Sequence, residues 1–200
     1  MMKAQYIDKG KFKHLYAVMQ YENVLALRVA LETGMRIGDV LALRVENLRA
    51  RTISYVAQKT GKRDKKVIDT HTADELRRNA SNGWLFPGRD PKKHRTRQAV
   101  YSDLRKACAV LGVSEHVTPH STRKIMAVDY FREHGLTETQ KALQHDRADT
   151  TMIYAFADLV DRNTRKTAES ELKWDSIDAL CRKIAMYVVE YLGNRGIIGR

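Results

Sequence analysis

The chain has few of the residues that mark secreted or metal-binding proteins. It holds only two cysteines in 200 residues, Cys108 and Cys181. Their separation fits neither a zinc site nor a redox Cys-x-x-Cys motif. They indicate ordinary reduced thiols, which predicts a cytoplasmic protein. Only three prolines and eleven glycines are present, with no internal repeat or low-complexity run. We therefore expect one ordinary folded domain, or one domain with an appendage.

Long apolar runs and cofactor motifs are missing as well. No stretch approaches the roughly 18 consecutive apolar residues of a membrane span, so we expect no membrane association. The first residues, MMKAQYIDKGKFKH, are basic but lack the apolar core of a secretory signal. The sequence contains no DxD or HExxH motif, no cluster of His and Cys, and no Walker-type glycine loop. It therefore predicts no cofactor and no metal site.

Positive charge is abundant. Lysine and arginine number 36 against 24 acidic residues, which gives a formal charge of +12 and a pI of about 9.8. A field of this sign attracts polyanions and speeds their capture. The hydrophobic share of 43% is enough for a packed core. The composition favours a nucleic-acid partner, and the competing interpretation is a basic protein without such a role.

The order of apolar residues predicts a mostly helical chain with one small sheet. Residues 51–70 differ from the rest, because Ile53, Tyr55 and Ala57 alternate with polar residues before a turn at Thr60-Gly61, which is typical of a β-hairpin. Elsewhere apolar residues recur at helical intervals. The helices we expect cover residues 11–20, 22–32, 37–48, 71–80, 97–111, 120–134, 137–143, 149–157 and about 172–192.

Four short segments suggest a reaction. They are TGMRIGDVLAL (33–43), QKTGK (58–62), PHSTRKIMAVDYF (119–131) and LQHDRADTTMIYAF (143–156). They carry, in order, Arg36, Lys59, His120, Arg123, His145 and Tyr154. In this order and spacing, the set resembles the catalytic domain of the tyrosine recombinases, the phage integrase family, over about residues 10–160. The resemblance implies a mostly α fold with a small antiparallel β-sheet (α+β). It also implies site-specific DNA recombination by metal-independent cleavage and rejoining through a 3′-phosphotyrosine.

Each matched residue suits one need of that reaction. The resemblance makes Tyr154 the nucleophile, with Arg36 and Arg123 as the two arginines on the phosphate. Guanidinium is permanently charged and binds phosphate oxygens in pairs, which suits this role. Taken singly, either arginine would be interpreted as an exposed surface residue. A free tyrosine titrates near pH 10, so neighbouring cations or a base must activate Tyr154.

The lysine and the histidines handle protons. Lys59 lies on the predicted hairpin turn, where the family places a lysine that protonates the leaving 5′ oxygen. Lys62, Lys65 and Lys66 share the hairpin and are alternatives. The HxxR spacing of His120 and Arg123 places both on one helical face.

The resemblance gives His120 the role of general base or phosphate donor, and His145 that of phosphate donor. These two roles can exchange, because histidine serves either near neutral pH. Asp39 matches an acidic residue of the family, and we expect it to orient the site or cap a helix.

Some positions depart from the family pattern. Gln144 replaces a usual glycine and Thr122 a usual leucine, which affects geometry more than chemistry. Family members usually carry a core-binding domain before this region, whereas Arg36 comes almost at once here. The chain is therefore either a fragment or a naturally short protein. We divide it into a catalytic domain, 1–160, and a C-terminal helical tail, 161–200, with no N-terminal core-binding domain.

The predicted partner is double-stranded DNA. We expect phosphate contacts from two basic groups on the hairpin and on the loop that follows residue 88: Lys62, Arg63, Lys65, Arg89, Lys92, Lys93, Arg95 and Arg97. In the tail, Ile177, Leu180, Ile184, Val188 and Leu192 recur at helical intervals. Such a stripe either folds back on its own domain or docks on a second copy of the chain, which would make a homo-oligomer on DNA.

Two other functions are compatible with the same residues. One is a non-catalytic DNA-binding accessory protein of the same fold, which the complete set of six residues argues against. The other is relaxation of supercoiled DNA in the manner of type IB topoisomerases, which would use the same phosphotyrosine chemistry on one duplex. The sequence gives neither the target site nor the direction of the reaction.

Overall fold

The computed structural model describes residues 4–143. The chain divides into Met1–Gln144 and His145–Arg200, and all described residues belong to the first of these units. The helices predicted at 149–157 and 172–192, and the domain boundary predicted at residue 160, lie outside the described residues.

The N-terminal elements are α1 (Lys9–His14), the 3-10 helix η1 (Leu15–Val18) and α2 (Tyr21–Thr33). The single helix predicted for residues 11–20 is therefore two shorter helical segments that begin earlier. Asp8 caps α1, since its carboxylate accepts hydrogen bonds from the first turn of backbone N–H groups. As predicted, α2 ends at Gly34, which has a φ of 68° and turns the chain toward the next helix.

The helix predicted over residues 37–48 is too long. The structure has α3 (Ile37–Leu41), then the 3-10 helix η2 (Val45–Asn47) and a short strand, β1 (Leu48–Arg49). The reason is a distant pairing. The carbonyl of Leu43 accepts a hydrogen bond from Leu85 N–H at 3.0 Å, and Val45 N–H donates to Gly83 O at 3.1 Å. These bonds occupy backbone groups that a longer helix would have used.

The predicted hairpin is confirmed. Strands β2 (Thr52–Val56) and β3 (Arg63–Val67) pair antiparallel with Ser54 opposite Lys65, and β1 adds a third strand beside β2. Ile53 is fully buried on the inner face, whereas Lys65 is exposed on the outer face. The strands thus present alternate residues to the core and to solvent, as the sequence pattern predicts.

Three more helices follow: α4 (Thr70–Asn79), α5 (Arg97–Val110) and α6 (His120–Ala142). They match the predicted ranges, and Gly135 interrupts α6 with a φ of 75° and a ψ of −175°, where the sequence predicted one helix to end. The predicted core residues Ile125, Val128 and Phe131 are buried. Among the described residues, no helix is both long enough and apolar enough to cross a membrane.

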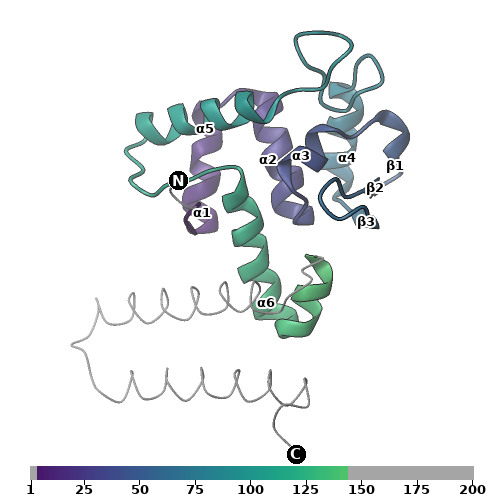
Figure 1. The fold of residues 1–200 in the computed structure, drawn as a ribbon. Coiled ribbons are helices and arrows are strands. Elements are labelled where there is room, and N and C mark those ends of the chain that lie inside the picture. Colours follow the sequence, from purple (N-terminus) through teal and green to yellow (C-terminus); the bar gives the residue numbers. More distant parts are fainter. Residues whose placement is uncertain (1–3, 144–200) are drawn as a thin grey trace, which may run out of the picture. The chain divides into compact units, whose positions relative to one another are not determined.

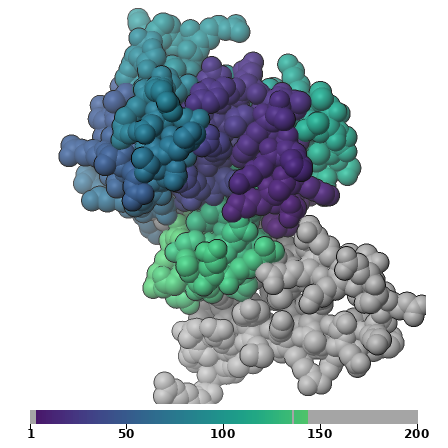
Figure 2. Space-filling view, turned by 180° about the vertical axis from the view of Figure 1, so that it is seen from behind, coloured from purple at the N-terminus to yellow at the C-terminus, as the bar shows by residue number. Residues whose placement is uncertain are grey.

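Helix α2 is central to this arrangement. It contacts α3, α4, α5 and α6, and Figure 1 shows it between the sheet side of the molecule and α1. Leu25, Leu27 and Val29 on α2 have no exposed surface. Figure 2 shows the purple N-terminal residues directly against the green residues of α6, in line with the ion pair of Lys9 and Asp129 at 2.7 Å. The core therefore fixes the start of α6 relative to α2 and α3.

Candidate active site

A pocket of about 490 Å³ brings together four of the six predicted catalytic residues. They come from three parts of the chain: the residue before α3, the turn between β2 and β3, and the first turn of α6. They are Arg36, Lys59, His120 and Arg123. His145 and Tyr154 lie outside the described residues.

Gly34 explains why the first motif needs its glycine. This residue has a positive φ, and a Cβ added there would lie 2.9 Å from Met126 Sδ and 3.0 Å from Leu143 Cδ2. The positive φ strains any residue with a side chain at this position, and the ends of the Met126 and Leu143 side chains would have to shift to admit it. Arg36 follows as the residue at the N-terminus of α3, where its carbonyl accepts hydrogen bonds from the first turn. Its half-buried side chain lines the pocket.

Arg123 is buried, with 5% of its surface exposed. Its guanidinium donates hydrogen bonds to the carbonyls of Gly34 and Leu143. A buried guanidinium requires such partners, because an unpaired buried charge is strongly unfavourable. The two bonds hold Arg123 in the pocket and connect it to both neighbouring segments of chain.

Asp39 links α3 to the segment that carries Lys59. Its Oδ1 accepts a hydrogen bond from Gln58 N–H at 3.0 Å, and the Gln58 side chain donates to Gly38 O at 3.4 Å. Asp39 therefore connects α3 to the residue before Lys59, and its role in orienting the site stays a prediction. Gln58 itself lines the pocket and was not a predicted site residue. In the sequence, only its position next to Lys59 could have indicated that Gln58 lines the pocket.

His120 begins α6 and opens onto the pocket. Its pKa is lowered to about 4, first by desolvation and then by the charges of Arg123, Lys124, Arg36 and Lys59. The imidazole is therefore neutral near pH 7. A neutral imidazole has one nitrogen that accepts a proton and one that donates a hydrogen bond, so it suits either predicted role.

Arg97 is the member of the predicted DNA-binding set that lines this pocket. It is the first residue of α5, whose N-cap is Thr96. Its Cδ lies 3.4 Å from where a Cβ on Gly38 would be, which is an ordinary van der Waals distance. Among the described residues, the pocket is thus lined by four arginine and lysine side chains and one carboxylate, Asp39. That balance favours an anion.

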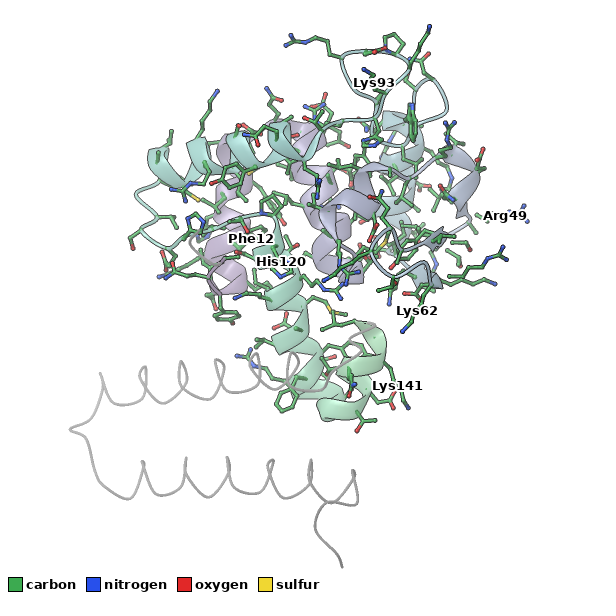
Figure 3. The ribbon with its side chains drawn as sticks, in the orientation of Figure 1. Phe12, Arg49, Lys62, Lys93, His120 and Lys141 are labelled. Carbon is green, nitrogen blue, oxygen red and sulfur yellow. The ribbon has the colours of Figure 1, made fainter. Side chains whose placement is uncertain are left out.

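The hairpin residues Lys62, Arg63 and Lys65 are exposed. Arg89 and Lys93, by contrast, line a second pocket of about 850 Å³ together with acidic residues. Figure 3 shows Lys93 well separated from both His120 and Lys62. The predicted DNA-binding residues therefore fall into two separate surfaces.

Arg95 and Lys92 complete the predicted set. Lys92 is exposed. Arg95 is mostly buried, donates to Asn23 Oδ1 at 2.6 Å and Gln20 Oε1 at 2.9 Å, and pairs with Glu22 at 3.6 Å. These contacts hold the basic loop to the start of α2. A phosphate contact for Arg95 stays a prediction.

Comparisons with known proteins agree on the family. The family model described as "Phage integrase family" matches residues 5–159. The integrase of Escherichia phage P2 is 30% identical over 152 residues, which cover 75% of this chain and 42% of that protein. The tyrosine recombinase XerD of Lacticaseibacillus casei is 32% identical over 137 residues, which cover 61% of this chain and 46% of that protein. The chain thus spans about half the length of these curated relatives.

Solved structures show the same fold. A lambda integrase tetramer bound to a Holliday junction superposes with a TM-score of 0.67 at 16% identity, covering 77% of this chain and 48% of that one. The catalytic domain of bacteriophage HP1 integrase superposes with a TM-score of 0.56 at 17% identity, covering 78% and 89%. The family match spans most of the chain, and the pocket holds the two arginines, the lysine and one of the histidines that were predicted from the sequence. The chain belongs to the phage integrase family of tyrosine recombinases.

Proposed function

We propose that the chain catalyses site-specific DNA recombination by cleaving and rejoining strands through a 3′-phosphotyrosine. The observation that carries the proposal is the pocket itself, where Arg36, Lys59 and Arg123 converge beside a neutral His120. Double-stranded DNA is the proposed substrate, because its scissile phosphate is an anion that such a pocket suits.

The proposed reaction has two steps. In cleavage, the Tyr154 hydroxyl loses its proton and its oxygen bonds to phosphorus, while the bond from phosphorus to the 5′ oxygen breaks. Lys59 gives a proton to that departing oxygen. In rejoining, a 5′ hydroxyl gives its proton to Lys59 and its oxygen bonds to phosphorus. The bond from phosphorus to the Tyr154 oxygen breaks, and Tyr154 regains the proton that it lost in cleavage. Because the phosphodiester is exchanged for a phosphotyrosine ester and is not hydrolysed, the strand can be resealed without another source of energy.

The described residues supply the positive charge for both steps. Arg36 and Arg123 stabilise the phosphate in the transition state, where preorganised donors have their largest effect. His120 accepts the proton of the nucleophile or donates a hydrogen bond to the phosphate, and His145 is the second proposed donor. Arg97, the first residue of α5, adds positive charge to the wall of the pocket. Phosphate contacts from the hairpin and from Arg89, Lys92 and Lys93 remain part of the proposal.

The test is capture of the covalent intermediate. The wild-type chain is incubated with a pool of nicked duplexes whose central sequence is randomised, in EDTA. Cleavage beside the nick releases a short 5′-hydroxyl fragment, which diffuses away and leaves an SDS-resistant adduct. We expect an adduct from wild type and from the control Tyr130→Phe, whose tyrosine lies on α6. We expect none from Tyr154→Phe, although that variant should still bind DNA.

Other outcomes point elsewhere. An adduct from Tyr154→Phe would reject the proposed nucleophile, and a requirement for magnesium to obtain the adduct would reject the metal-independent mechanism. Binding without any adduct would favour a DNA-binding accessory protein. Relaxation of supercoiled plasmid without recombinant products would favour the topoisomerase-like activity.

A further inference from the structure

Two cations hold the end of α6. Lys66 Nζ donates to the carbonyl of Ala142 at 2.7 Å, and Arg123 donates to the carbonyl of Leu143. The last carbonyls of a helix lack partners within the helix, and they carry its partial negative charge. Both bonds therefore satisfy groups that would otherwise be unpaired. One of the two cations belongs to the pocket, whereas the other comes from β3.

The Lys66 side chain lies inside a small network on the inner face of the hairpin. It is only 16% exposed and pairs with Asp64 Oδ2 at 3.0 Å. The same carboxylate oxygen accepts a hydrogen bond from the Tyr55 hydroxyl at 3.4 Å. Burial, followed by the nearby charge of Asp64, raises the pKa of Tyr55, so this tyrosine stays protonated and can donate. Lys66 is thus fixed by Asp64 while it holds Ala142.

This contact joins the hairpin to α6, and both of these elements contribute residues to the candidate site. The hairpin carries Lys59 at its turn, α6 carries His120 and Arg123 at its start, and Leu143 is the last described residue before the segment with His145 and Tyr154. Lys66 does not line the pocket. Because Ala142 and Leu143 are joined covalently to the residues that follow, a displacement of the Ala142 carbonyl would also displace the start of the next segment.

We propose that Lys66 is a positioning residue for strand cleavage: by binding the Ala142 carbonyl, it fixes the end of α6 from which the segment with His145 and Tyr154 starts. It touches neither the scissile phosphate nor the leaving oxygen. The inference rests on the proposed phosphotyrosine chemistry. It also separates Lys66 from Lys59, with which it shares the hairpin.

The chain provides a matched control. Lys65 and Lys66 are neighbours on β3, carry the same charge and point to opposite faces, because Lys65 is exposed. Lys66→Met and Lys65→Met each remove one ammonium group while keeping a long side chain. Lys65 is a predicted phosphate contact, so Lys65→Met is expected to weaken DNA binding. In the free protein, and in cleavage of bound DNA at saturating protein, any difference between the two variants therefore reports the contact of Lys66 rather than the net charge. Lys66→Arg retains a charged donor and should recover most of the function.

The first measurement needs no DNA. Hydrogen exchange of the free protein should become faster in the last turn of α6, residues 138–143, in Lys66→Met but not in Lys65→Met. Unchanged exchange in Lys66→Met would overturn the proposed contact. This result stands whether or not the chain cleaves DNA, so failure of the inference can be told from failure of the proposed function. If Lys66→Met does not fold, Lys66→Gln is compared with Lys65→Gln in the same way.

The second measurement separates positioning from proton donation. It uses the duplex recovered with the wild-type adduct, and the same duplex with sulfur in place of the bridging 5′ oxygen. The phosphorus–sulfur bond then breaks to release a thiolate, which needs no proton because thiols titrate near pH 8.5. The sulfur substrate should restore cleavage by Lys59→Met. Lys66→Met should cleave both substrates more slowly, by up to roughly 10²-fold for a displacement near 1 Å, with unchanged DNA affinity.

Three results would reject the proposal. Restoration of Lys66→Met by sulfur would make Lys66 the proton donor. Equal decreases in affinity and cleavage would make it an ordinary phosphate contact. Equal slowing in Lys65→Met would leave only an effect of net charge.

Discussion

The charge state of His120 depends on what occupies the pocket. In the free protein its pKa is lowered to about 4, by desolvation first and then by four nearby cations. A bound phosphate places negative charge among the same cations, so the pKa should return toward its ordinary value near 6.5. DNA binding then takes up a proton between about pH 6.5 and pH 4, and affinity must rise as the pH falls through that window.

We therefore predict that the wild-type chain binds DNA more tightly at pH 5 than at pH 7. The rise cannot exceed about tenfold per pH unit for one proton. His120→Gln should lack this component, whereas His134→Gln, changed on the same helix, should retain it. Binding is measured by fluorescence anisotropy at fixed salt. Identical pH profiles for wild type and His120→Gln would show that the phosphate does not approach His120.

The same histidine lowers the stability of the free protein as the pH falls, whereas it raises the affinity for DNA. The unfolded chain takes up the proton first as the pH falls, because its histidine titrates near 6.5 and the folded one at about 4. The free energy of unfolding contributed by His120 therefore falls between about pH 6.5 and pH 4. Thermal unfolding curves of His120→Gln and His134→Gln over this pH range give the fraction of folded protein at the assay temperature. The binding data are corrected by that fraction.

At the scale of elements, the hairpin and the basic loop make separable contributions. Arg63 and Lys65 are exposed on the strand that follows the Lys59 turn, and Arg89 and Lys93 line the other pocket. We predict that either pair of alanine substitutions lowers the slope of log affinity against log salt by roughly 0.9 for each phosphate interaction that it removes. Neither pair should slow cleavage of DNA that is already bound, because none of these four side chains lines the pocket that holds Lys59.

The two pairs remove the same charge, so each serves as a control for the other. Affinity over a series of salt concentrations and single-turnover cleavage at saturating protein separate the two effects. A pair that leaves the salt slope unchanged does not contact phosphate. Salt-insensitive nanomolar binding by the wild-type chain would contradict the whole electrostatic argument.

Local patterns were sufficient for some elements and insufficient for others. The alternation around Ile53 and the turn at Gly61 predicted the hairpin, and Gly135 predicted the interruption of α6, because these signals act over a few residues. The end of α3 is decided by pairing of Leu43 with Leu85, far along the chain. The bond from Lys66 to Ala142 spans 76 positions. No periodic pattern in the sequence indicates such a contact. The residues that line the pocket could therefore be predicted from their motifs, whereas the bond from Lys66 to Ala142 could not.

At the scale of the whole molecule, the tail raises the question of how copies of the chain assemble on DNA. The segment of residues 172–192 lies outside the described residues, but its sequence places Ile177, Leu180, Ile184, Val188 and Leu192 on one face of a helix. An apolar stripe of this kind requires a surface to cover it. That surface is either its own catalytic domain or a second copy of the chain.

We predict that the stripe docks on a second copy when DNA is bound. Leu180→Asp with Ile184→Asp places two charges in the stripe, which should weaken self-association and cooperative DNA binding while leaving the melting temperature of the catalytic domain unchanged. Ala179→Asp with Met186→Asp places the same two charges on the opposite helical face and should retain assembly. Sedimentation of the protein with DNA measures the stoichiometry. A wild-type complex that stays monomeric at high protein concentration would leave docking on its own domain, and a fall in melting temperature confined to the first variant would support that arrangement.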